Sequence, residues 1–312
     1  MLPRDVFLRR GKVLYNPHVR PHMCRGRSVL AAICFLLSMR FAYESACRAQ
    51  EAPAASGARI LLLPRRLVIG ERATLAVLDV NGRLTPGVTV EFSYGEKVKT
   101  DTTGRARFVA PLNPETIYAW IEGRRGKVSS MIVTPAEIPS SSLEVTAVPR
   151  VATSSDRFDV QGHGFCGDAD ANHVTIGGVA GLVLASSPGN LVVLPPADLE
   201  PGPMRVQVGC GPKMSEPFTM VFVSLELAAS SATLSPGERR TLVVRVKGSS
   251  AKINLEARNL GADVAELVGG GIVRAMSSGG AENEAKFELV GRTRGNFTIS
   301  IRLVAPLSPP RP

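Results

Sequence analysis

The sequence predicts an all-β protein in which three tandem β-sandwiches follow an N-terminal signal peptide. Short runs of alternating apolar and polar residues recur between Gly, Pro and Asn residues. This pattern is typical of antiparallel strands that are joined by turns. The chain after Gln50 shows no pattern of a long amphipathic helix. About 260 residues follow the leader, which are too many for one small sandwich and divide into three of about 80.

Residues 1–49 have the order of a secretory signal peptide. Seven Lys and Arg residues lie within residues 1–27, and an almost entirely apolar core of 12 residues follows at 28–39. A membrane-spanning helix needs about 20 apolar residues, so this core is too short for one. Small residues precede Gln50, which predicts cleavage after Ala49. The chain is therefore expected to be exported, to the periplasm or outside the cell, and to have no membrane span once processed.

Two features of the leader stay open. Translation could begin at Met23, because a basic region still precedes the apolar core from there. Cys47 follows small residues as in a lipoprotein signal, but Glu44 stands where such a signal has Leu or another aliphatic residue. Lipidation of Cys47, and an uncleaved leader that anchors the chain, are the alternatives to cleavage after Ala49.

The charge of the chain argues against a nucleic-acid partner. The full sequence has a formal net charge of +10, but nine of its Lys and Arg residues and only two acids lie in residues 1–49. The remainder has 28 basic and 25 acidic residues, which is too balanced for a basic nucleic-acid footprint. The outer two domains are positive and the middle one is negative. This alternation indicates either ordinary solvated surface or weak attraction of the outer domains to anionic cell-surface polymers.

The first domain is predicted at residues 58–134. Asn81-Gly82 and Pro86-Gly87 are turn dipeptides between its alternating runs. The expected strands are Ile60–Leu63, Ala73–Asp79, Val88–Tyr94, Ala106–Ala110, Thr116–Glu122 and Ser129–Val133. Trp120 is expected in the core or on a sheet face. The hairpin at 77–92 and the turn at 100–106 resemble a bacterial immunoglobulin-like (Big) or carboxypeptidase-regulatory-like repeat, which implies a fold and no particular function.

A Pro/Ser-rich linker at 135–142 leads to the middle domain at residues 143–223. The domain carries a G-x-G-F corner at 162–165, an N-x-V-x-I-G-G hairpin at 172–178 and a late proline, Pro195. In this order the motifs resemble the bacterial IPT/TIG immunoglobulin-like domain. The resemblance implies a scaffold without chemistry of its own.

Cys166 and Cys210 are predicted to form a disulfide. The other three of the five cysteines lie in the leader, and an exported chain meets oxidising conditions. Cys166 is expected after the second strand of the middle domain and Cys210 after the sixth, and these strand ends share one pole of an immunoglobulin-like sandwich. The bond would stabilise the domain by about 4 kcal/mol on the chain-entropy model. Two free buried thiols are the alternative.

The third domain is predicted at residues 224–304, followed by a Pro-rich tail at 305–312. The segment 234–238 resembles the turn that opens many bacterial immunoglobulin-like repeats. The tail is expected to be extended and unpacked. The expected strands are Thr241–Lys247, Ile253–Arg258, Gly271–Met276, Ala285–Val290 and Phe297–Val304.

The chain lacks the motifs of common enzymes. His163 and His173 are the only histidines after the leader, and no nucleophile elbow, phosphate loop, nucleotide fingerprint or zinc-protease motif occurs. Aromatic residues make up 5% of the chain, which is low for a sugar-binding platform. We therefore expect no catalytic residue and no cofactor.

One segment, 163–173, gathers two histidines, two aspartates and an asparagine. Asp168, Asp170 and Asn172 have the spacing that begins a calcium loop, but His173 replaces the required Gly and no Glu follows at the final position. Zinc bound by His163 and His173 would require Cys166 to be free. A turn whose Asp and Asn side chains bond their own backbone is the interpretation adopted. Calcium stays open.

These features together predict an exported, non-catalytic protein that acts in envelope adhesion, assembly or spacing. Its partner would be an envelope or extracellular protein or polysaccharide. The alternative is an accessory binding component of a secreted carbohydrate-active system, because domains that resemble IPT/TIG also occur in secreted polysaccharide enzymes. Fold-level analogy does not separate the two.

Overall fold

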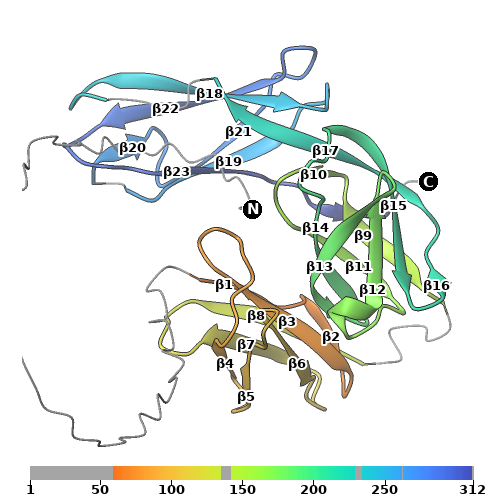
Figure 1. Ribbon diagram of the computed structural model, residues 1–312. Helices are drawn as coiled ribbons and strands as arrows, with labels where there is room; N and C mark the ends of the chain where they lie inside the picture. Colours follow the sequence, from red (N-terminus) through yellow and green to blue (C-terminus); the bar gives the residue numbers. More distant parts are fainter. Residues whose placement is uncertain (1–58, 135–141, 229–233, 262, 311–312) are drawn as a thin grey trace, which may run out of the picture. The chain divides into compact units, whose positions relative to one another are not determined.

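The computed structural model describes residues 59–134, 142–228, 234–261 and 263–310 (Figure 1). The predicted signal peptide, its cleavage after Ala49, and the questions at Met23 and Cys47 lie outside the described residues. In the described part the regular structure is strand, apart from a short 3-10 turn, η2 (Ala169–Ala171). The all-β prediction is confirmed.

The first sandwich packs a three-stranded sheet on a five-stranded one. The smaller sheet has the order β1-β3-β6 and the larger has the order β2-β8-β7-β4-β5. On β7, Ile117, Ala119 and Ile121 are buried in the shared core, while Tyr118 and Trp120 face outward. Trp120 therefore lies on a sheet face. The strands are β1 (Ile60–Leu62), β2 (Arg66–Val68), β3 (Arg72–Leu78), β4 (Thr89–Phe92), β5 (Lys97–Lys99), β6 (Arg105–Val109), β7 (Thr116–Ile121) and β8 (Lys127–Val133).

The middle sandwich joins its two sheets through one long strand, β13, which pairs β12 on one side and β14 on the other. The β12–β13 turn is Gly177-Gly178, and both residues have positive φ, 59° and 84°, as a tight two-residue hairpin requires. The strands are β9 (Glu144–Pro149), β10 (Val151–Thr153), β11 (Phe158–His163), β12 (Asn172–Ile176), β13 (Val179–Ser187), β14 (Asn190–Leu194), β15 (Gly202–Cys210), β16 (Lys213–Met214) and β17 (Phe218–Leu227).

The third sandwich has one sheet in the order β20-β22-β18-β17 and a second in the order β21-β19-β23. Its core is built from Leu255, Phe287, Leu289 and Ile299, among others. The strands that it adds are β18 (Arg239–Lys247), β19 (Asn254–Asn259), β20 (Ala265–Leu267), β21 (Ile272–Met276), β22 (Glu284–Gly291) and β23 (Ile299–Leu303).

One strand belongs to two sandwiches. The first half of β17 pairs with β15 of the middle sandwich, and Ser224–Leu227 pair with β18 of the third. Phe222 is buried in the middle core and its neighbour Val223 in the third. The boundary predicted between residues 223 and 224 thus falls inside an unbroken strand.

The tail is not unpacked, contrary to the prediction. Leu307 and Ser308 form β24, which pairs antiparallel with Val148 and Pro149 of β9 in the middle sandwich. Arg150 Nε also donates to Ser308 Oγ at 3.1 Å. The composition was misleading because Leu307 and Ser308, although flanked by prolines, keep the backbone N–H groups that an edge strand needs.

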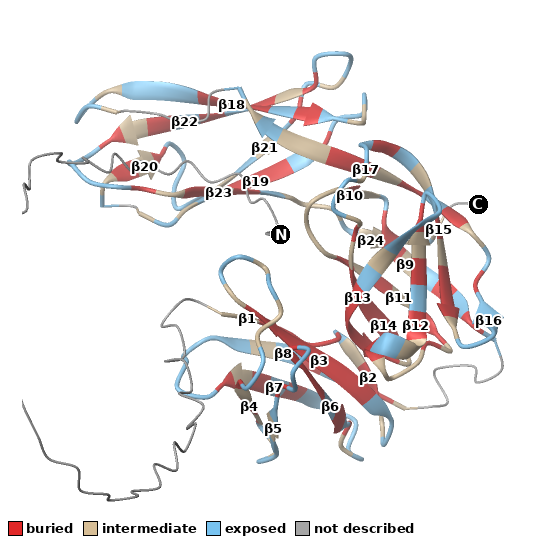
Figure 2. Ribbon diagram, in the orientation of Figure 1, coloured by how far each residue is buried: buried red, intermediate tan, exposed pale blue. Residues whose placement is uncertain are grey.

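Strand β3 is buried on both faces (Figure 2). Leu75 and Val77 point into the core of the first sandwich, whereas Ala76 and Leu78 join a separate apolar cluster with Leu184 of the middle one. A strand that is covered on both sides reads as a continuous apolar run, which Ala73–Val80 is apart from Thr74 and Asp79. The first and middle sandwiches therefore share buried surface.

Candidate functional site

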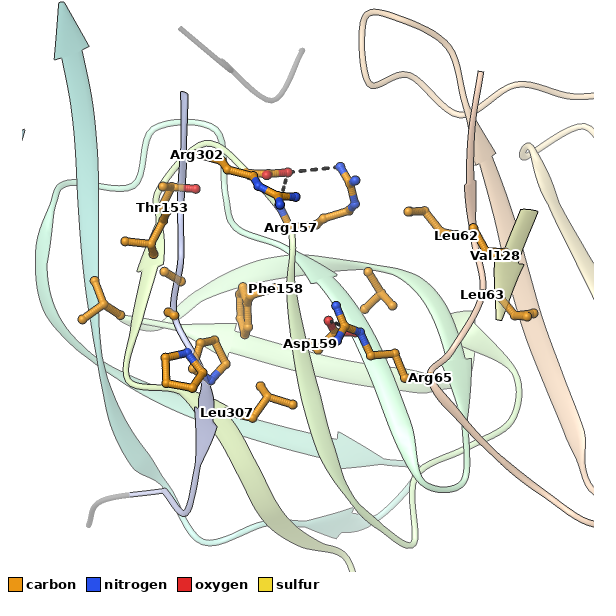
Figure 3. A pocket seen from close by; sticks show the side chains of 18 of the residues that line it. Leu62, Leu63, Arg65, Val128, Thr153, Arg157, Phe158, Asp159, Arg302 and Leu307 are labelled. Carbon is orange, nitrogen blue, oxygen red and sulfur yellow. Dashed lines mark hydrogen bonds and ion pairs between the residues drawn. The ribbon is translucent and has the colours of Figure 1, made fainter. Parts of the chain in front are cut away.

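A cleft of about 820 Å³ is lined by residues of all three sandwiches (Figure 3). The β1–β2 segment and β8 of the first sandwich contribute to it, as do β10 and the start of β11 in the middle sandwich. The third sandwich adds the end of β23 and the chain that leads to β24. The cleft therefore depends on the two junctions that hold the sandwiches together.

Much of the cleft lining is apolar and aliphatic. Leu62, Leu225, Leu303 and Leu307 line it together with Phe158. The Phe158 ring is only 6% exposed and packs edge-on against Phe222, with the ring centroids 5.7 Å apart. The ring thus belongs to the core of the middle sandwich and does not form a flat stacking platform.

Charged pairs border the apolar lining. Arg65 Nε of the first sandwich lies 3.2 Å from Asp159 Oδ2 of the middle one. The two side chains lie together in Figure 3. Burial raises the pKa of Asp159, and this effect outweighs the nearby Arg65 guanidinium and a hydrogen bond from Asn190. Arg157 pairs with Asp156 at 3.1 Å. The cleft can therefore meet a ligand with both hydrogen-bond donors and acceptors.

The structure joins Cys166 and Cys210 in a disulfide, with Cα atoms 5.5 Å apart. Cys166 follows β11 and Cys210 ends β15, where it pairs with Asn172 of β12. These are the third and seventh strands of the domain, not the second and sixth, because two strands, β9 and β10, precede β11. The pairing itself does not depend on that count.

The segment 163–173 is a structured turn between two strands. Asn172 bridges it, accepting from Cys166 N at 2.9 Å and donating to Cys166 O and Asp168 O at 2.8 Å each. The two histidines lie outside the turn: His163 ends β11, buried, with Nε2 2.9 Å from Glu144 Oε2, and His173 is exposed on β12. Among the described residues, no group of three or more His, Cys, Asp or Glu side chains could hold a metal ion.

The aspartates of this turn make contacts that the sequence did not predict. Asp168 Oδ2 lies 2.7 Å from Arg107 Nη2, and Asp170 Oδ1 lies 3.0 Å from Arg105 Nη1. Both arginines belong to β6 of the first sandwich. The turn therefore serves as a contact between two sandwiches.

Arg105 is the residue at this junction that sequence reasoning missed. Its side chain is 8% exposed and donates from Nη2 to Val183 O at 2.7 Å and from Nε to Leu184 O at 3.2 Å. No local pattern marks Arg105, since an arginine at a strand start is ordinarily a solvated residue. Its acceptors lie almost 80 residues further along the chain.

A family model described as an IPT/TIG domain matches residues 134–222. This confirms the resemblance carried by the middle domain. IPT/TIG domains have an immunoglobulin-like fold and are typically non-catalytic modules. No curated protein matches the chain.

Several solved structures are similar to this chain. A Bacteroides ovatus mixed-linkage glucan utilization locus protein, SGBP-B, in complex with a mixed-linkage heptasaccharide, is 11% identical with a TM-score of 0.31, covering 77% of this chain and 74% of its own. Domains 1–6 of the surface layer protein SbsC are 13% identical with a TM-score of 0.21, covering 81% of this chain. This match spans only 39% of the solved SbsC chain. The tandem Ig repeats of Dlar are 10% identical with a TM-score of 0.21, covering 54% of this chain and 98% of theirs.

These likenesses are too distant to say anything about a ligand.

In the part of the chain that the structure describes, no helix is long and apolar enough to cross a membrane.

Proposed function

We propose that this protein is an exported, non-catalytic contact protein that acts in cell-surface adhesion, assembly or spacing. Its domains would be a Big-like or carboxypeptidase-regulatory-like sandwich at 58–134, the IPT/TIG domain at 143–223 and a third immunoglobulin-like sandwich at 224–304. The observation that carries the proposal is the cleft of about 820 Å³, to which all three sandwiches contribute. A ligand in this cleft would contact the whole assembly at once.

The cleft favours an extended, amphipathic segment of a partner protein. Partly exposed aliphatic side chains such as Leu225 and Leu307 would contact apolar side chains of the segment. The Arg65–Asp159 and Arg157–Asp156 pairs at the same cleft offer partners for its backbone and polar groups. The Arg65 side chain is 68% exposed, and each guanidinium has N–H groups beyond those used in its pair.

A polysaccharide ligand is the second candidate, as in an accessory component of a carbohydrate-active system. Sugar rings commonly stack on exposed aromatic rings. In the cleft the ring is that of Phe158, which is buried against Phe222. The protein segment is therefore the better fit to this site.

The absence of catalytic motifs in the sequence supports a binding role. His163 is buried beside Glu144, and His173 is exposed on another strand, so the two imidazoles do not form a shared site with a nucleophile. In the loop between the two histidines, Asp168 and Asp170 form ion pairs with arginines of the first sandwich.

The proposal is tested by substitutions that fill the cleft with large side chains. Ser129→Trp and Thr153→Trp place bulk at two residues that line it, and Thr241→Trp adds the same bulk on exposed β18, away from it. Each mature protein is immobilised and incubated with envelope extract, with and without protease treatment of the extract. We expect a protease-sensitive partner that the wild type and Thr241→Trp retain and that both cleft variants lose.

Two outcomes would contradict the proposal. A partner that remains bound to both cleft variants would place the contact elsewhere. A partner that survives protease treatment but is released by glycosidases would favour the carbohydrate alternative.

A further inference from the structure

The outward face of sheet β21-β19-β23 is an arginine grid. Three rows of residues cross the strands: Asn254 beside Met276, Glu256 between Arg274 and Arg302, and Arg258 between Ile272 and Ser300. The alternate residues, such as Leu255 and Ala257, are buried in the core, so strand alternation points these rows away from it. These eight residues together form the arginine grid.

Glu256 is the only acid of the arginine grid. Arg302 Nη2 lies 2.6 Å from Glu256 Oε1, Arg274 Nε lies 3.1 Å from Oε2, and Arg258 Nη2 lies 3.9 Å from Oε1. The carboxylate is covered by these side chains and is 2% exposed, whereas the arginines are 48–70% exposed. The grid therefore presents guanidinium groups to solvent and hides its single negative charge.

Glu256 stays ionised at neutral pH. Burial alone would raise the pKa of its carboxyl group, but hydrogen bonds from Arg274 and Arg302 more than offset this and lower the pKa below its ordinary value. Three arginines against one carboxylate leave a net charge of +2 on a single sheet face. Most guanidinium N–H groups remain available for a ligand, because a guanidinium has five.

The outward face of the other sheet of the third sandwich has a different balance of charge. The outward positions of its strands carry four cations, Arg239, Arg245, Lys247 and Lys286, and four carboxylates, Glu226, Glu266, Glu284 and Glu288. Arg245 pairs with Glu284 at 3.0 Å and Lys247 with Glu226 at 2.8 Å. The strands of this second sheet thus balance their charges, and the arginine grid does not.

We propose that the arginine grid binds an acidic polysaccharide through its carboxylate groups. A planar guanidinium matches a carboxylate with two parallel N–H donors. The row that holds Arg274 and Arg302 spans two inter-strand spacings, about 10 Å, so separate carboxylates of one linear polymer can reach both. Ile272 and Met276, which are 51% and 60% exposed, lie in the same grid and offer apolar contact to the C–H faces of sugar rings.

A polysaccharide fits this surface better than an acidic protein. A stable protein interface has a fully buried, mostly apolar core with a polar rim, whereas here the arginines occupy the centre and the apolar side chains lie beside them. A flexible polymer with one charge per repeat needs only such a shallow, charged face. This inference is separate from the cleft, which Arg302 borders but Arg258 and Arg274 do not.

The test uses alginate, a linear polyuronate, with neutral dextran as a reference. The double variant Arg258→Gln/Arg274→Gln removes two cations and keeps the Arg302–Glu256 bond that covers the buried carboxylate. The matched control, Arg239→Gln/Lys286→Gln, removes two cations from the balanced sheet. Thermal unfolding of each variant confirms that the third sandwich is intact.

We expect wild type to bind alginate and not dextran, with affinity that falls steeply as salt rises to about 1 M, where the Debye length is about 3 Å. The Arg258/Arg274 variant should bind about tenfold more weakly, as two exposed ion contacts imply, and the control within about twofold of wild type. Equal losses in the two variants would overturn the proposal. So would salt-independent binding, or binding of poly-L-glutamate in place of alginate.

Discussion

The two junctions of this protein are built in different ways. Buried side chains join the first and middle sandwiches, whereas the backbone joins the middle and third. At the first junction, β3 and β13 meet at a single bridge, Ser186 to Thr74, and side chains complete the contact. At the second junction the strand β17 passes unbroken from one sheet to the next.

At the first junction, hydrogen bonds from polar side chains and the packing of an apolar cluster both hold the two sandwiches together. Arg105 donates to two main-chain carbonyls of β13, Ser187 Oγ donates to Arg66 O, and Thr74 Oγ1 donates to Gly167 O at 2.8 Å. A Cβ on Gly167 would lie 2.0 Å from Arg72 O, so the turn approaches the first sandwich too closely for any side chain. Such a junction depends on particular residues.

The second junction depends on chain continuity. Five residues of β17 pair with β15 and the next segment pairs with β18, with Val223 between them. β24 adds a second backbone link by pairing with β9. Because main-chain hydrogen bonds carry these contacts, most side-chain changes should leave them in place. The comparison therefore predicts that substitutions act locally at the first junction and that only backbone changes break the second.

The largest effect is expected from Val223→Pro. Proline cannot donate a ladder hydrogen bond and is excluded from central strands, so both sandwiches that share β17 should lose stability. We expect a loss of at least about 4 kcal/mol in urea unfolding. Val223→Ala removes side-chain volume and leaves the strand intact, and should cost about half as much. Equal losses would show that backbone continuity does not hold this junction.

The next effect is expected from Arg105→Ala. The change leaves the carbonyl groups of Val183 and Leu184 without their donor in a buried place, which costs about 2–5 kcal/mol in total. Arg107→Ala is the matched control, because Arg107 crosses the same junction to Asp168 but is 63% exposed. Its loss should stay under about 1 kcal/mol. Hydrogen exchange of β3 and β13 would show whether the damage is confined to the junction, and comparable losses would refute the role given to Arg105.

Removing the disulfide should destabilise the middle sandwich by about 2–4 kcal/mol. Cys166 precedes the turn that contacts the first sandwich, so Cys166→Ser/Cys210→Ser should also weaken protection at Thr74 and leave β18 unchanged. Peptide-resolved hydrogen exchange measures both. Loss of protection in the third sandwich would mean that the disulfide acts globally and not through the turn.

The smallest effect is expected from Asp159→Asn, which changes a largely buried carboxylate at the first junction. Burial raises the pKa of Asp159 above its ordinary value of 3.8, so the ionised form is disfavoured in the folded protein. Wild type therefore loses stability as pH rises through the raised pKa, and the asparagine variant does not. The variant should be more stable at pH 7 by about 1 kcal/mol or less, with the gain vanishing below pH 3.8. A gain that persists at low pH would contradict this account.

Much of the internal structure of each sandwich could be predicted from local pattern. The alternating run at Thr116–Glu122 predicted a strand where β7 (Thr116–Ile121) lies, and Gly177-Gly178 marked a hairpin that has positive φ at both positions. Strands β2, β5 and β20, each of three residues, were not predicted. β24 was missed because prolines surround it.

The candidate site could not be predicted in the same way. Arg65 and Asp159, which border the cleft, are 94 positions apart, and neither has a local pattern that distinguishes it from a solvated charge. The two aspartates of the segment 163–173 were recognised as a cluster, but their partners Arg105 and Arg107 were not. A cluster in sequence shows which groups are near each other and does not show what they face.

The all-β class, the positions of the longer strands and the cysteine pair could be read from the chain because each follows from local rules: alternation with period two, turns at glycine, and two cysteines left after the leader. The junctions, the cleft and the arginine grid were not, because they arise from the pairing of distant strands. Glu256 illustrates the limit. Only the register of β21, β19 and β23 places this one carboxylate among three arginines, and that register is set by packing across the whole sandwich.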